Sequence, residues 1–347
     1  MSAVERAVAT VDLGAIERNC ARLPKPLCAV VKADAYGHGP VAVAALAGGA
    51  SQLAVAAADE AAELRRQGID TPILVMGAMT ADELRVAIGA GADVVAWTDE
   101  VAEAAPRVHV KLDTGMGRLG TKDRELALRL ADRDNVVGLM THFATADDLE
   151  DDLFDAQLEA FREFVDEADR SDVVAHAANS AAALREPASH FDMVRCGVAI
   201  YGMDPFGEDP AAHGLEPALS LRSWVGAVRR FEAGDSAGYG RRWTAPEPTW
   251  VATVPIGYGD GWRRALSNNG EVLIGGRRHP LAGTVSMDNV TVALGPDTDV
   301  AVGDEVVLLG AQGEERILAE EVARRIDTIN YEITCALTPR VRRQYLP

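Results

Sequence analysis

The sequence predicts an α/β + β protein, with an N-terminal (β/α)8 barrel followed by a mainly antiparallel β domain. Two observations lead to this prediction. Short apolar runs alternate with helix-forming segments in the first part of the chain, and after about residue 216 the runs are broken by glycine and proline instead. A chain of 347 residues also suits one large and one smaller domain. We place the domains at 1–215 and 216–347.

Eight strands are expected in the first part. They are separated by Ala-, Leu-, Glu- and Arg-rich segments of helical period, such as DEAAELRRQG and DRELALRLADR. Apolar strands that alternate with helices indicate a parallel sheet covered on both faces, and eight such units favour a closed barrel over an open sheet. The expected strands are Leu27–Val31, Leu53–Ala57, Ile73–Met76, Asp93–Trp97, Val108–Leu112, Val136–Thr141, Val173–Ala177 and Met193–Arg195.

The second part reads as antiparallel β structure. Runs such as TWVATVPIGYG, EVLIGGRRHPLAGTVS and DEVVLLG alternate or are apolar, and Gly and Pro separate them. One amphipathic helix is expected at Leu318–Ile326. The strand-like run Ala7–Asp12 fits either domain, and residues 1–10 are able to pair with the β domain.

Composition excludes several classes of partner. The formal net charge is -19, from 53 acidic against 34 basic residues, which argues against nucleic acid or an anionic membrane surface. The most apolar stretch is divided by Gly48 and Gly49, and the N-terminus lacks an apolar signal core, so we expect a cytoplasmic protein. The four cysteines are scattered without a CxxC pair, so neither a disulfide framework nor a metal site is expected.

The unusual residues of the first part cluster directly after the expected strands, in KADAYGHG, DTGMGRLG, HFATAD, ANSAAAL and RCGVAIYG. In a (β/α)8 barrel these loops carry the chemistry. The first of them begins with Lys32, at the end of an apolar run. Most such lysines are solvated, but one that enters a Gly-rich turn can be partly desolvated, which lowers its pKa and makes the amine a nucleophile towards carbonyl groups.

The segment GMGRLG, Gly115–Gly120, offers a competing interpretation. It satisfies the GxGxxG pattern of a dinucleotide-binding turn, and Asp134 lies at a tolerable distance for a ribose contact. Three points count against it. The motif follows the fifth strand of an unbroken series, Arg118 places a bulky cation where the turn must approach a pyrophosphate, and Lys111 and Asp113 form an ionic site just before it.

Eight motifs together resemble one family. AVVKADAYGHG, KLDTGMGRLG, MTHFATAD, ANSAAAL, VRCGVAIYG, VPIGYGDG, GTVSMDNV and INYEITC occur in the order seen in bacterial alanine racemases, over almost the whole chain. The resemblance implies a barrel-plus-β fold, pyridoxal 5'-phosphate (PLP) as the cofactor and interconversion of L- and D-alanine, which supplies D-alanine for peptidoglycan. Lys32 resembles the lysine that forms the Schiff base with PLP.

The resemblance implies two bases on opposite faces of the α-carbon. Lys32 would serve one face and Tyr258 the other, and racemisation requires both. A tyrosine needs nearby cations or donors to act as a base, and the family pattern offers His142 and Arg195. Arg195 matches the residue that hydrogen-bonds the pyridine nitrogen. Because arginine stays protonated, it weakens the electron sink and favours reprotonation over transamination.

The remaining site residues also follow from the resemblance. The phosphate is expected against Ser180, Gly197, Val198, Tyr36 and Tyr331. Arg118 resembles the arginine that contacts the substrate carboxylate, and Lys111 a lysine often carboxylated to a carbamate that holds this arginine. Met287 and Asp288 fall on the family's substrate-entrance positions, and Tyr239 and Tyr331 are expected to crowd the methyl side of the pocket.

The family pattern further implies a homodimer with shared active sites. Two departures from the pattern are Ser286, where many relatives have cysteine, and Gly259, where alanine is commoner. A racemase of broader specificity, acting on serine or larger side chains, is the main alternative. A non-catalytic PLP-binding protein would lack the GYGDG and SMDNV segments, and the related decarboxylases carry a Cys-Asp-Ser segment that is missing here.

Overall fold

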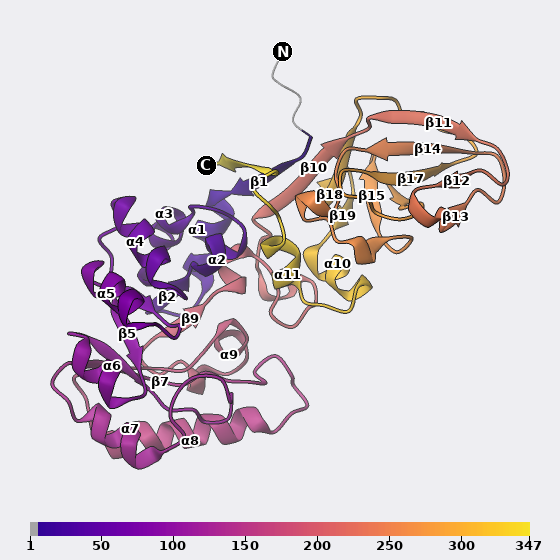
Figure 1. Ribbon diagram of the computed structural model, residues 1–347. Helices are drawn as coiled ribbons and strands as arrows, with labels where there is room; N and C mark the ends of the chain where they lie inside the picture. Colours follow the sequence, from indigo (N-terminus) through magenta and orange to yellow (C-terminus); the bar gives the residue numbers. More distant parts are fainter. Residues whose placement is uncertain (1–5) are drawn as a thin grey trace. The chain divides into compact units, whose positions relative to one another are not determined.

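The computed structural model describes residues 6–347, which divide into two compact units. The barrel unit comprises Ile16–Tyr36 and Pro40–Ile200. The β unit comprises the described residues up to 15, Gly37–Gly39 and Tyr201–Pro347 (Figure 1). None of the helices in residues 6–347 is long and apolar enough to cross a membrane.

The barrel unit is built on eight parallel strands in the order β8-β7-β6-β5-β4-β3-β2-β9. All eight expected strands are present. Two backbone hydrogen bonds connect the β8 and β9 edges, from Asp192 N to Ala175 O (3.0 Å) and from Arg195 N to Ala178 O (2.8 Å). The strands are β2 (Leu27–Val30), β3 (Ala50–Val55), β4 (Ile73–Val75), β5 (Asp93–Ala96), β6 (Val108–Lys111), β7 (Val136–Met140), β8 (Val174–His176) and β9 (Val194–Cys196).

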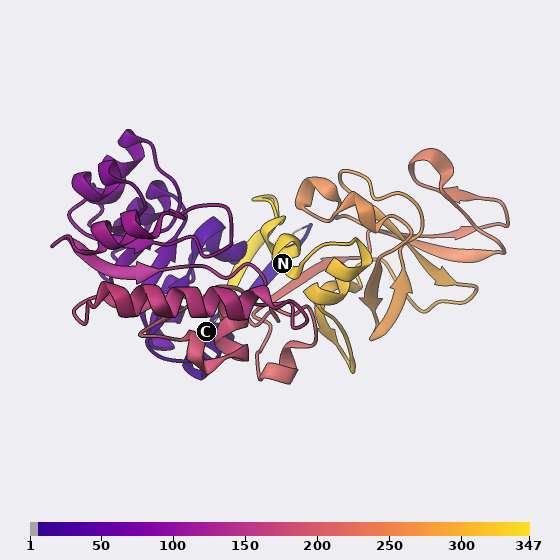
Figure 2. The same cartoon turned by 90° about the horizontal axis from the view of Figure 1, so that it is seen from below.

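Helices follow the strands and lie along their outer side, as α4, α5 and α6 do in Figure 1. Every residue of β2, β4, β5 and β6 is buried, as expected for strands covered on both faces. The long helix α8 runs across the unit in Figure 2. The helices are α1 (Leu13–Arg22), α3 (Ala42–Ala47), α4 (Ala58–Arg66), α5 (Ala81–Gly89), α6 (Asp99–Ala104), α7 (Arg124–Ala131), α8 (Leu153–Ala168) and α9 (Ser180–Arg185).

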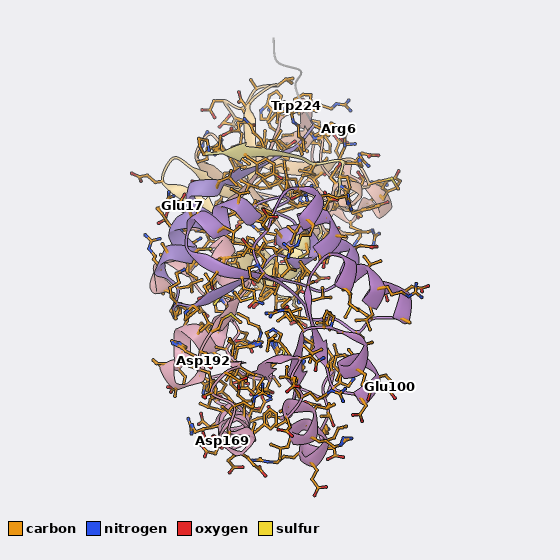
Figure 3. All side chains as sticks on the ribbon, turned by 90° about the vertical axis from the view of Figure 1, so that its left-hand side faces the viewer. Arg6, Glu17, Glu100, Asp169, Asp192 and Trp224 are labelled. Carbon is orange, nitrogen blue, oxygen red and sulfur yellow. The ribbon has the colours of Figure 1, made fainter. Side chains whose placement is uncertain are left out.

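Acidic side chains lie on the outside of the barrel unit. Glu100 and Asp169 are exposed and point away from the strands in Figure 3. Asp192 is also exposed, while its Oδ2 accepts a hydrogen bond from Ala175 N of β8 (2.8 Å). Their placement allows a strongly acidic chain to keep its interior apolar, because the charges remain in water.

The β unit is mainly antiparallel, with one sheet in the order β16-β15-β18-β10-β1-β20, a three-stranded sheet β11-β14-β17 and the pair β12-β13. Strand β1 pairs antiparallel with β10 and parallel with β20. The strands are β1 (Val8–Asp12), β10 (Leu219–Trp224), β11 (Ala227–Phe231), β12 (Ser236–Ala237), β13 (Trp243–Thr244), β14 (Thr249–Val254), β15 (Glu271–Ile274), β16 (Arg277–Pro280), β17 (Val290–Gly295), β18 (Glu305–Gln312), β19 (Glu315–Ile317) and β20 (Arg342–Leu346).

Two helices accompany these sheets. The expected helix Leu318–Ile326 is confirmed as α10 (Ala319–Arg325). A second helix, α11 (Asn330–Cys335), falls in a segment for which sequence patterning predicted no helix. Short 3-10 turns are η1 (Pro187–Ser189), η2 (Val198–Tyr201), η3 (Pro210–His213), η4 (Tyr239–Arg241), η5 (Tyr258–Asp260) and η6 (Arg264–Leu266).

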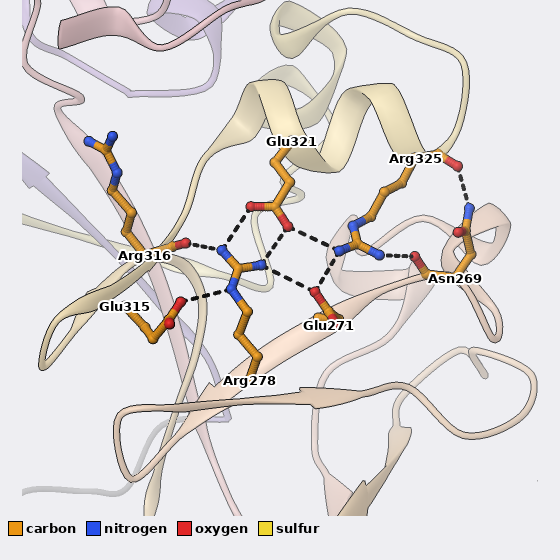
Figure 4. A network of polar contacts seen from close by, with 7 residues as sticks. All are labelled: Asn269, Glu271, Arg278, Glu315, Arg316, Glu321 and Arg325. Atoms are coloured by element: carbon orange, nitrogen blue, oxygen red, sulfur yellow. Dashed lines mark hydrogen bonds and ion pairs between the residues drawn. The ribbon is translucent and has the colours of Figure 1, made fainter.

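A network of ion pairs joins α10 to the large sheet of the β unit (Figure 4). Arg278 bonds to Glu321 (2.6 Å), Glu271 (3.2 Å) and Glu315 (2.9 Å), and Arg325 bonds to Glu271 (2.5 Å) and Glu321 (3.1 Å). Burial alone would raise the pKa of Glu321, but hydrogen bonds from the two arginines outweigh it and lower that pKa. The network therefore stabilises the ionised form of Glu321.

We expect Arg278→Ala to lower the free energy of unfolding by about 1–2 kcal/mol, because three carboxylates lose a shared partner that solvent only partly screens. The loss is measured by urea unfolding. A depressed carboxyl pKa stabilises the fold above the unfolded pKa of about 4.3, and this stability disappears as the pH falls through the lower folded pKa. Arg277→Ala is the control, because its partner Asp299 is 83% exposed. Equal effects of the two substitutions would contradict the network's role.

Candidate active site

Lys32 follows β2 and opens a left-handed turn, Lys32–Tyr36 (α2). Four consecutive residues, none of them glycine, have φ between 50° and 56°. Each L-residue in this conformation costs roughly 1–2 kcal/mol, so surrounding contacts must hold it in place. Glu60 supplies one such contact by accepting a hydrogen bond from Ala33 N (2.5 Å). Local sequence patterns did not predict this turn, because left-handed backbone usually requires glycine.

Positive groups converge at the carboxyl ends of the barrel strands. Lys111, the last residue of β6, is only 4% exposed, and burial together with Arg195 and Arg118 lowers its pKa to about 8. Burial lowers the pKa of His142 well below its usual value, as do Arg195, Lys111, Arg118 and Lys32. The site therefore holds a group of electrostatically interacting residues: Lys32, Lys111, Arg118, His142 and Arg195. Such a concentration of cations is suited to anionic ligands.

Arg195, on β9, is held rigidly by protein acceptors. Its NH1 donates to His176 Nδ1 (2.7 Å) and His176 O (2.9 Å), and its NH2 donates to Thr141 O (2.8 Å) and Ala177 O (3.0 Å). His142 Nδ1 lies 3.3 Å from the same NH2. No residue among 6–347 accepts a hydrogen bond from its Nε–H. That donor is therefore available to a ligand.

A hydroxyl-and-amide cradle follows β8 and β9. Ser180 Oγ accepts hydrogen bonds from Gly197 N (3.0 Å) and Ala199 N (3.3 Å), where η2 begins at Val198. The Tyr36 hydroxyl packs directly on Gly197, because a Cβ added at that glycine would lie 2.2 Å from the hydroxyl oxygen. The barrel unit thus brings together four of the five residues predicted for the phosphate.

The GMGRLG segment forms a loop with its own internal support. Asp113 accepts hydrogen bonds from Gly115 N (3.1 Å) and Gly117 N (3.0 Å). Backbone bonds between Asp113 N and Thr121 O (2.8 Å) and between Thr121 N and Lys111 O (3.1 Å) close the loop. The amides that a pyrophosphate would need are already engaged, and the loop lies in a parallel barrel. The dinucleotide interpretation is wrong.

The β unit carries Tyr258 on the turn η5. Tyr258 N donates to Ser286 O (3.0 Å) and Gly259 N donates to Met287 O (2.9 Å), so the turn lies against the segment that holds Met287 and Asp288. The side chains of Tyr258 and Met287 are 42% and 51% exposed. Three residues predicted from distant motifs are therefore neighbours on one surface of this unit.

Arg340 ties these two segments together. Its Nε lies 3.1 Å from Asp260 Oδ1 and its NH2 lies 2.7 Å from Asp288 Oδ1. Asp260 in turn accepts a hydrogen bond from Gly257 N (2.9 Å). A Cβ at Gly259 would lie 2.5 Å from Arg340 NH1 and 3.0 Å from Met287 O, so an alanine at this position would require the arginine side chain to shift. Sequence patterning did not identify Arg340, which lies about 80 residues from Tyr258.

Two further tyrosines of the β unit were predicted near the substrate. Tyr331 lies on α11. Tyr239 lies on η4, is 74% exposed and lines a cavity of about 390 Å³ together with Thr284 and Ser286. The substrate roles of these two tyrosines stay predictions.

The barrel unit fits PLP. The cofactor requires an amine, a cradle for its phosphate and a donor for its ring nitrogen. Lys32 offers the amine, Ser180 and Gly197 lie in the cradle, and Arg195 offers the Nε–H that no described residue uses. The surplus of positive charge around His142 suits the anionic phosphate and the carboxylate of an amino acid.

Comparisons with known proteins agree with this geometry. Family models described as "Alanine racemase, N-terminal domain" and "Alanine racemase, C-terminal domain" match residues 11–205 and 218–345. The chain is 41% identical to the alanine racemase of Symbiobacterium thermophilum, covering 97% of this chain and 96% of that protein. It is also 41% identical to alanine racemase 1 of Bacillus subtilis, covering 97% and 92%.

Solved structures give the same result. The alanine racemase of a D-cycloserine-producing Streptomyces lavendulae is 38% identical, with a TM-score of 0.91 over 99% of this chain and 97% of that one. The biosynthetic alanine racemase of Pseudomonas aeruginosa is 38% identical, with a TM-score of 0.90 over 99% and 100%. With both domain models matched and this identity sustained over nearly the full length, the chain belongs to the alanine racemase family of PLP-dependent enzymes.

Proposed function

We propose that this alanine racemase moves the α-hydrogen of alanine with two bases, Lys32 on one face and Tyr258 on the other. The observation that carries the proposal is the placement of Lys32 among cations that suit PLP, with Tyr258 held on the β unit beside Met287. Chiral analysis of the products from alanine, serine and larger amino acids tests the substrate class. Faster racemisation of serine than of alanine would favour the broader-specificity alternative. The D-alanine formed would serve peptidoglycan.

Each residue of the barrel unit has a proposed task. When bound, PLP supplies the electron sink that acidifies the α-hydrogen. Lys32 Nζ holds the cofactor and moves a proton at one face of the α-carbon. Arg195 would donate its Nε–H to the ring nitrogen, and because arginine keeps its proton, it would not protonate that nitrogen. Ser180, Tyr36 and the backbone of Gly197 and Val198 would orient the phosphate, and His142 places its Nδ1 near Arg195.

The β unit would supply the opposite base and the substrate contacts. Tyr258 Oη moves the proton at the second face, and the Met287–Asp288 segment meets the substrate carboxylate. Arg118, on the β6 loop of the barrel unit, binds the same carboxylate, and Tyr331 contributes its hydroxyl to the phosphate. Arg340 supports this arrangement because it bridges Asp260, on the same turn as Tyr258, to Asp288.

Lys111 is proposed to carry a carbamate. A buried amine beside Arg195 and Arg118 has the wrong charge, whereas a carbamate would hold Arg118 by an ion pair. The lowered pKa of Lys111, about 8, supports the proposal because only a neutral amine reacts with CO2. Carbamate formation should therefore increase as the pH rises through this value and decline at lower pH, where the amine is protonated.

We expect Lys111→Ala to lower kcat/KM for alanine by about a hundredfold, since Arg118 loses the anion that orients it. Added acetate should restore part of the activity by filling the vacated space. Labelling with ¹³C bicarbonate and ¹³C NMR should show a carbamate in the unsubstituted enzyme and none in the variant. Lys122→Ala, which alters an exposed lysine of the same loop, is the control. A fully active Lys111→Ala enzyme would contradict the proposal.

The enzyme is proposed to act as a two-fold homodimer in which the β unit of one subunit completes the barrel site of the other. The exposure of large side chains on the β unit supports this. Tyr258, Met287, Tyr239 and Ile329 are 42%, 51%, 74% and 60% exposed on the isolated chain. Exposed apolar and aromatic side chains of this kind are typical of protein interfaces.

Subunit mixing tests the shared site. Inactive Lys32→Ala and inactive Tyr258→Phe enzymes are combined, allowed to exchange subunits and assayed. Random pairing makes about half of the dimers mixed, and each mixed dimer has one intact site, so about a quarter of the unsubstituted activity should return. If both residues of a site came from one chain, every site would lack one of them. Absence of recovery after confirmed exchange would then exclude the shared site.

A further inference from the structure

A chain of buried polar side chains leads away from Arg195 through the interior of the barrel unit. Arg195 NH1 lies 2.7 Å from His176 Nδ1, and His176 Nε2 lies 2.7 Å from His109 Nδ1. His109 Nε2 lies 3.4 Å from Asp93 Oδ2. The four residues are between 0% and 5% exposed. Asp93 is the first residue of β5, so the chain ends at the opposite edge of the sheet from the candidate site.

Hydrogen-bond chemistry fixes the direction of this chain. Arginine has no acceptor, so His176 Nδ1 must accept from Arg195 and the proton of His176 must lie on Nε2. His176 Nε2–H then donates to His109 Nδ1, which leaves the proton of His109 on Nε2. That proton faces Asp93 Oδ2. Both imidazoles are therefore neutral, and every donor points from Arg195 toward Asp93.

A glycine creates the space for this chain. Gly138, on β7, pairs with His109 on β6 and with Val174 on β8. A Cβ at Gly138 would lie 2.1 Å from His109 Nδ1, closer than any side chain permits. His109 can therefore reach across β7 to His176 only because residue 138 has no side chain.

The two ends of the chain carry opposite charges. Arg195 is buried, and no carboxylate among residues 6–347 contacts it; burial lowers its pKa to about 10. Burial alone would raise the pKa of Asp93, but hydrogen bonds from His109 and Arg107 outweigh it and lower that pKa. Arg107 Nε lies 2.6 Å from Asp93 Oδ1. Asp93 is thus an anion linked to the buried cation by two oriented imidazoles.

We propose that Asp93 is a positioning residue for Arg195. Through His109 and His176, Asp93 fixes the direction of the hydrogen bonds that hold the guanidinium in place, so that the Nε–H remains available to the cofactor ring. The inference rests on the proposed position of Arg195 beside that ring. It adds a carboxylate at the far edge of the barrel to the residues on which racemisation depends.

Asp93→Asn is the decisive variant because it preserves shape while reversing one hydrogen bond. Arg107 donates to both Asp93 oxygens, from Nε to Oδ1 (2.6 Å) and from NH2 to Oδ2 (3.3 Å). An asparagine has a single oxygen, which keeps the shorter of these bonds, so its amide NH2 faces His109 Nε2. His109 must then accept at Nε2 and carry its proton on Nδ1, where it meets the Nε2–H of His176. The chain cannot satisfy both ends, and the orientation of Arg195 loosens.

Two measurements follow the variant as holoenzyme. ¹⁵N NMR of histidine-labelled protein reports which ring nitrogen of each histidine is protonated. The protein has seven histidines, so single substitutions can assign each signal to its residue. We expect Nε2–H for His109 and His176 in the unsubstituted enzyme, Nδ1–H for His109 in Asp93→Asn, and a fall in kcat of roughly tenfold, the equivalent of about one pKa unit. Asp192→Asn is the matched control. Asp192 lines the same cavity of about 240 Å³ as Asp93 and His109, but it takes no part in the hydrogen-bonded chain from Arg195 to Asp93.

A second pair of variants, at His109, tests the inference even if the Asp93→Asn protein does not fold. His109→Gln keeps one acceptor and one donor and should retain kcat within about threefold, whereas His109→Leu should lose about tenfold. The inference is overturned if Asp93→Asn keeps the original histidine protonation, or if its kcat matches that of Asp192→Asn. Arg195→Lys tests the underlying assignment separately through the visible absorption of the bound cofactor. An unchanged spectrum of Arg195→Lys refutes the position of Arg195 beside the cofactor ring. A changed spectrum of Arg195→Lys, together with unchanged kcat and histidine protonation in Asp93→Asn, refutes only the role of Asp93.

Discussion

Lys32→Ala is expected to lower kcat by at least about a thousandfold and to remove the visible absorption that a lysine-linked cofactor gives. The reason is that one amine both holds the cofactor and moves the proton on one face, so that no single remaining group replaces it. The left-handed turn that begins at Lys32 directs this amine, and alanine at the same position leaves the turn without its functional group.

The small number of lysines makes this test sharp. The chain has only Lys25, Lys32, Lys111 and Lys122, so borohydride reduction followed by peptide mapping identifies the labelled residue without ambiguity. Lys25 donates to Cys20 O (2.6 Å) and Gly48 O (3.1 Å), which gives it a structural role. Lys122→Ala serves as the control. Covalent label on any lysine other than Lys32, or a Lys32→Ala enzyme with unchanged colour, would refute the assignment.

Tyr258→Phe is expected to lower kcat by about a hundredfold to ten-thousandfold, the range typical of removing a general acid or base. The loss in kcat/KM must be equal for L- and D-alanine, because the equilibrium constant between enantiomers is one. The free energy of unfolding should change by less than about 0.5 kcal/mol, since the substitution removes one oxygen from a side chain that is 42% exposed.

A matched control exists for this prediction on the same unit. Tyr239→Phe removes a hydroxyl from another exposed tyrosine and should reduce kcat far less. Activities in both directions and thermal unfolding are measured for the two variants in parallel. Comparable losses for Tyr239→Phe and Tyr258→Phe would show that a general effect on the β unit, and not a lost base, explains the result.

Much of the fold was predictable from local patterns. The eight barrel strands have short apolar runs bounded by helical segments, and burial on both faces makes such runs uniform enough to recognise. Helix α10 was predicted from its amphipathic period. Helix α11 was missed because its six residues are too few to display a period, and the parallel pairing of β1 with β20 joins opposite ends of the chain.

The site was predictable to a different degree. Resemblance of the motifs to the family identified Lys32, Arg195 and Ser180, each of which follows or lies on a strand at the expected edge. The supporting residues carry no local signal. His109 and Asp93 lie inside ordinary strands, and only the register that places Gly138 beside His109 reveals their link to Arg195.

Isotope exchange tests the two-base account most directly. Holoenzyme is incubated in D2O with L- or D-alanine, and the initial rate of α-deuterium incorporation into the unconverted enantiomer is measured after chiral separation. The resemblance to the family implies that Tyr258 serves L-alanine and Lys32 serves D-alanine. For Tyr258→Phe, the account therefore predicts that D-alanine continues to exchange through Lys32, while exchange into L-alanine falls with kcat. Equal residual exchange into both enantiomers would contradict the assignment of Lys32 and Tyr258 to opposite faces.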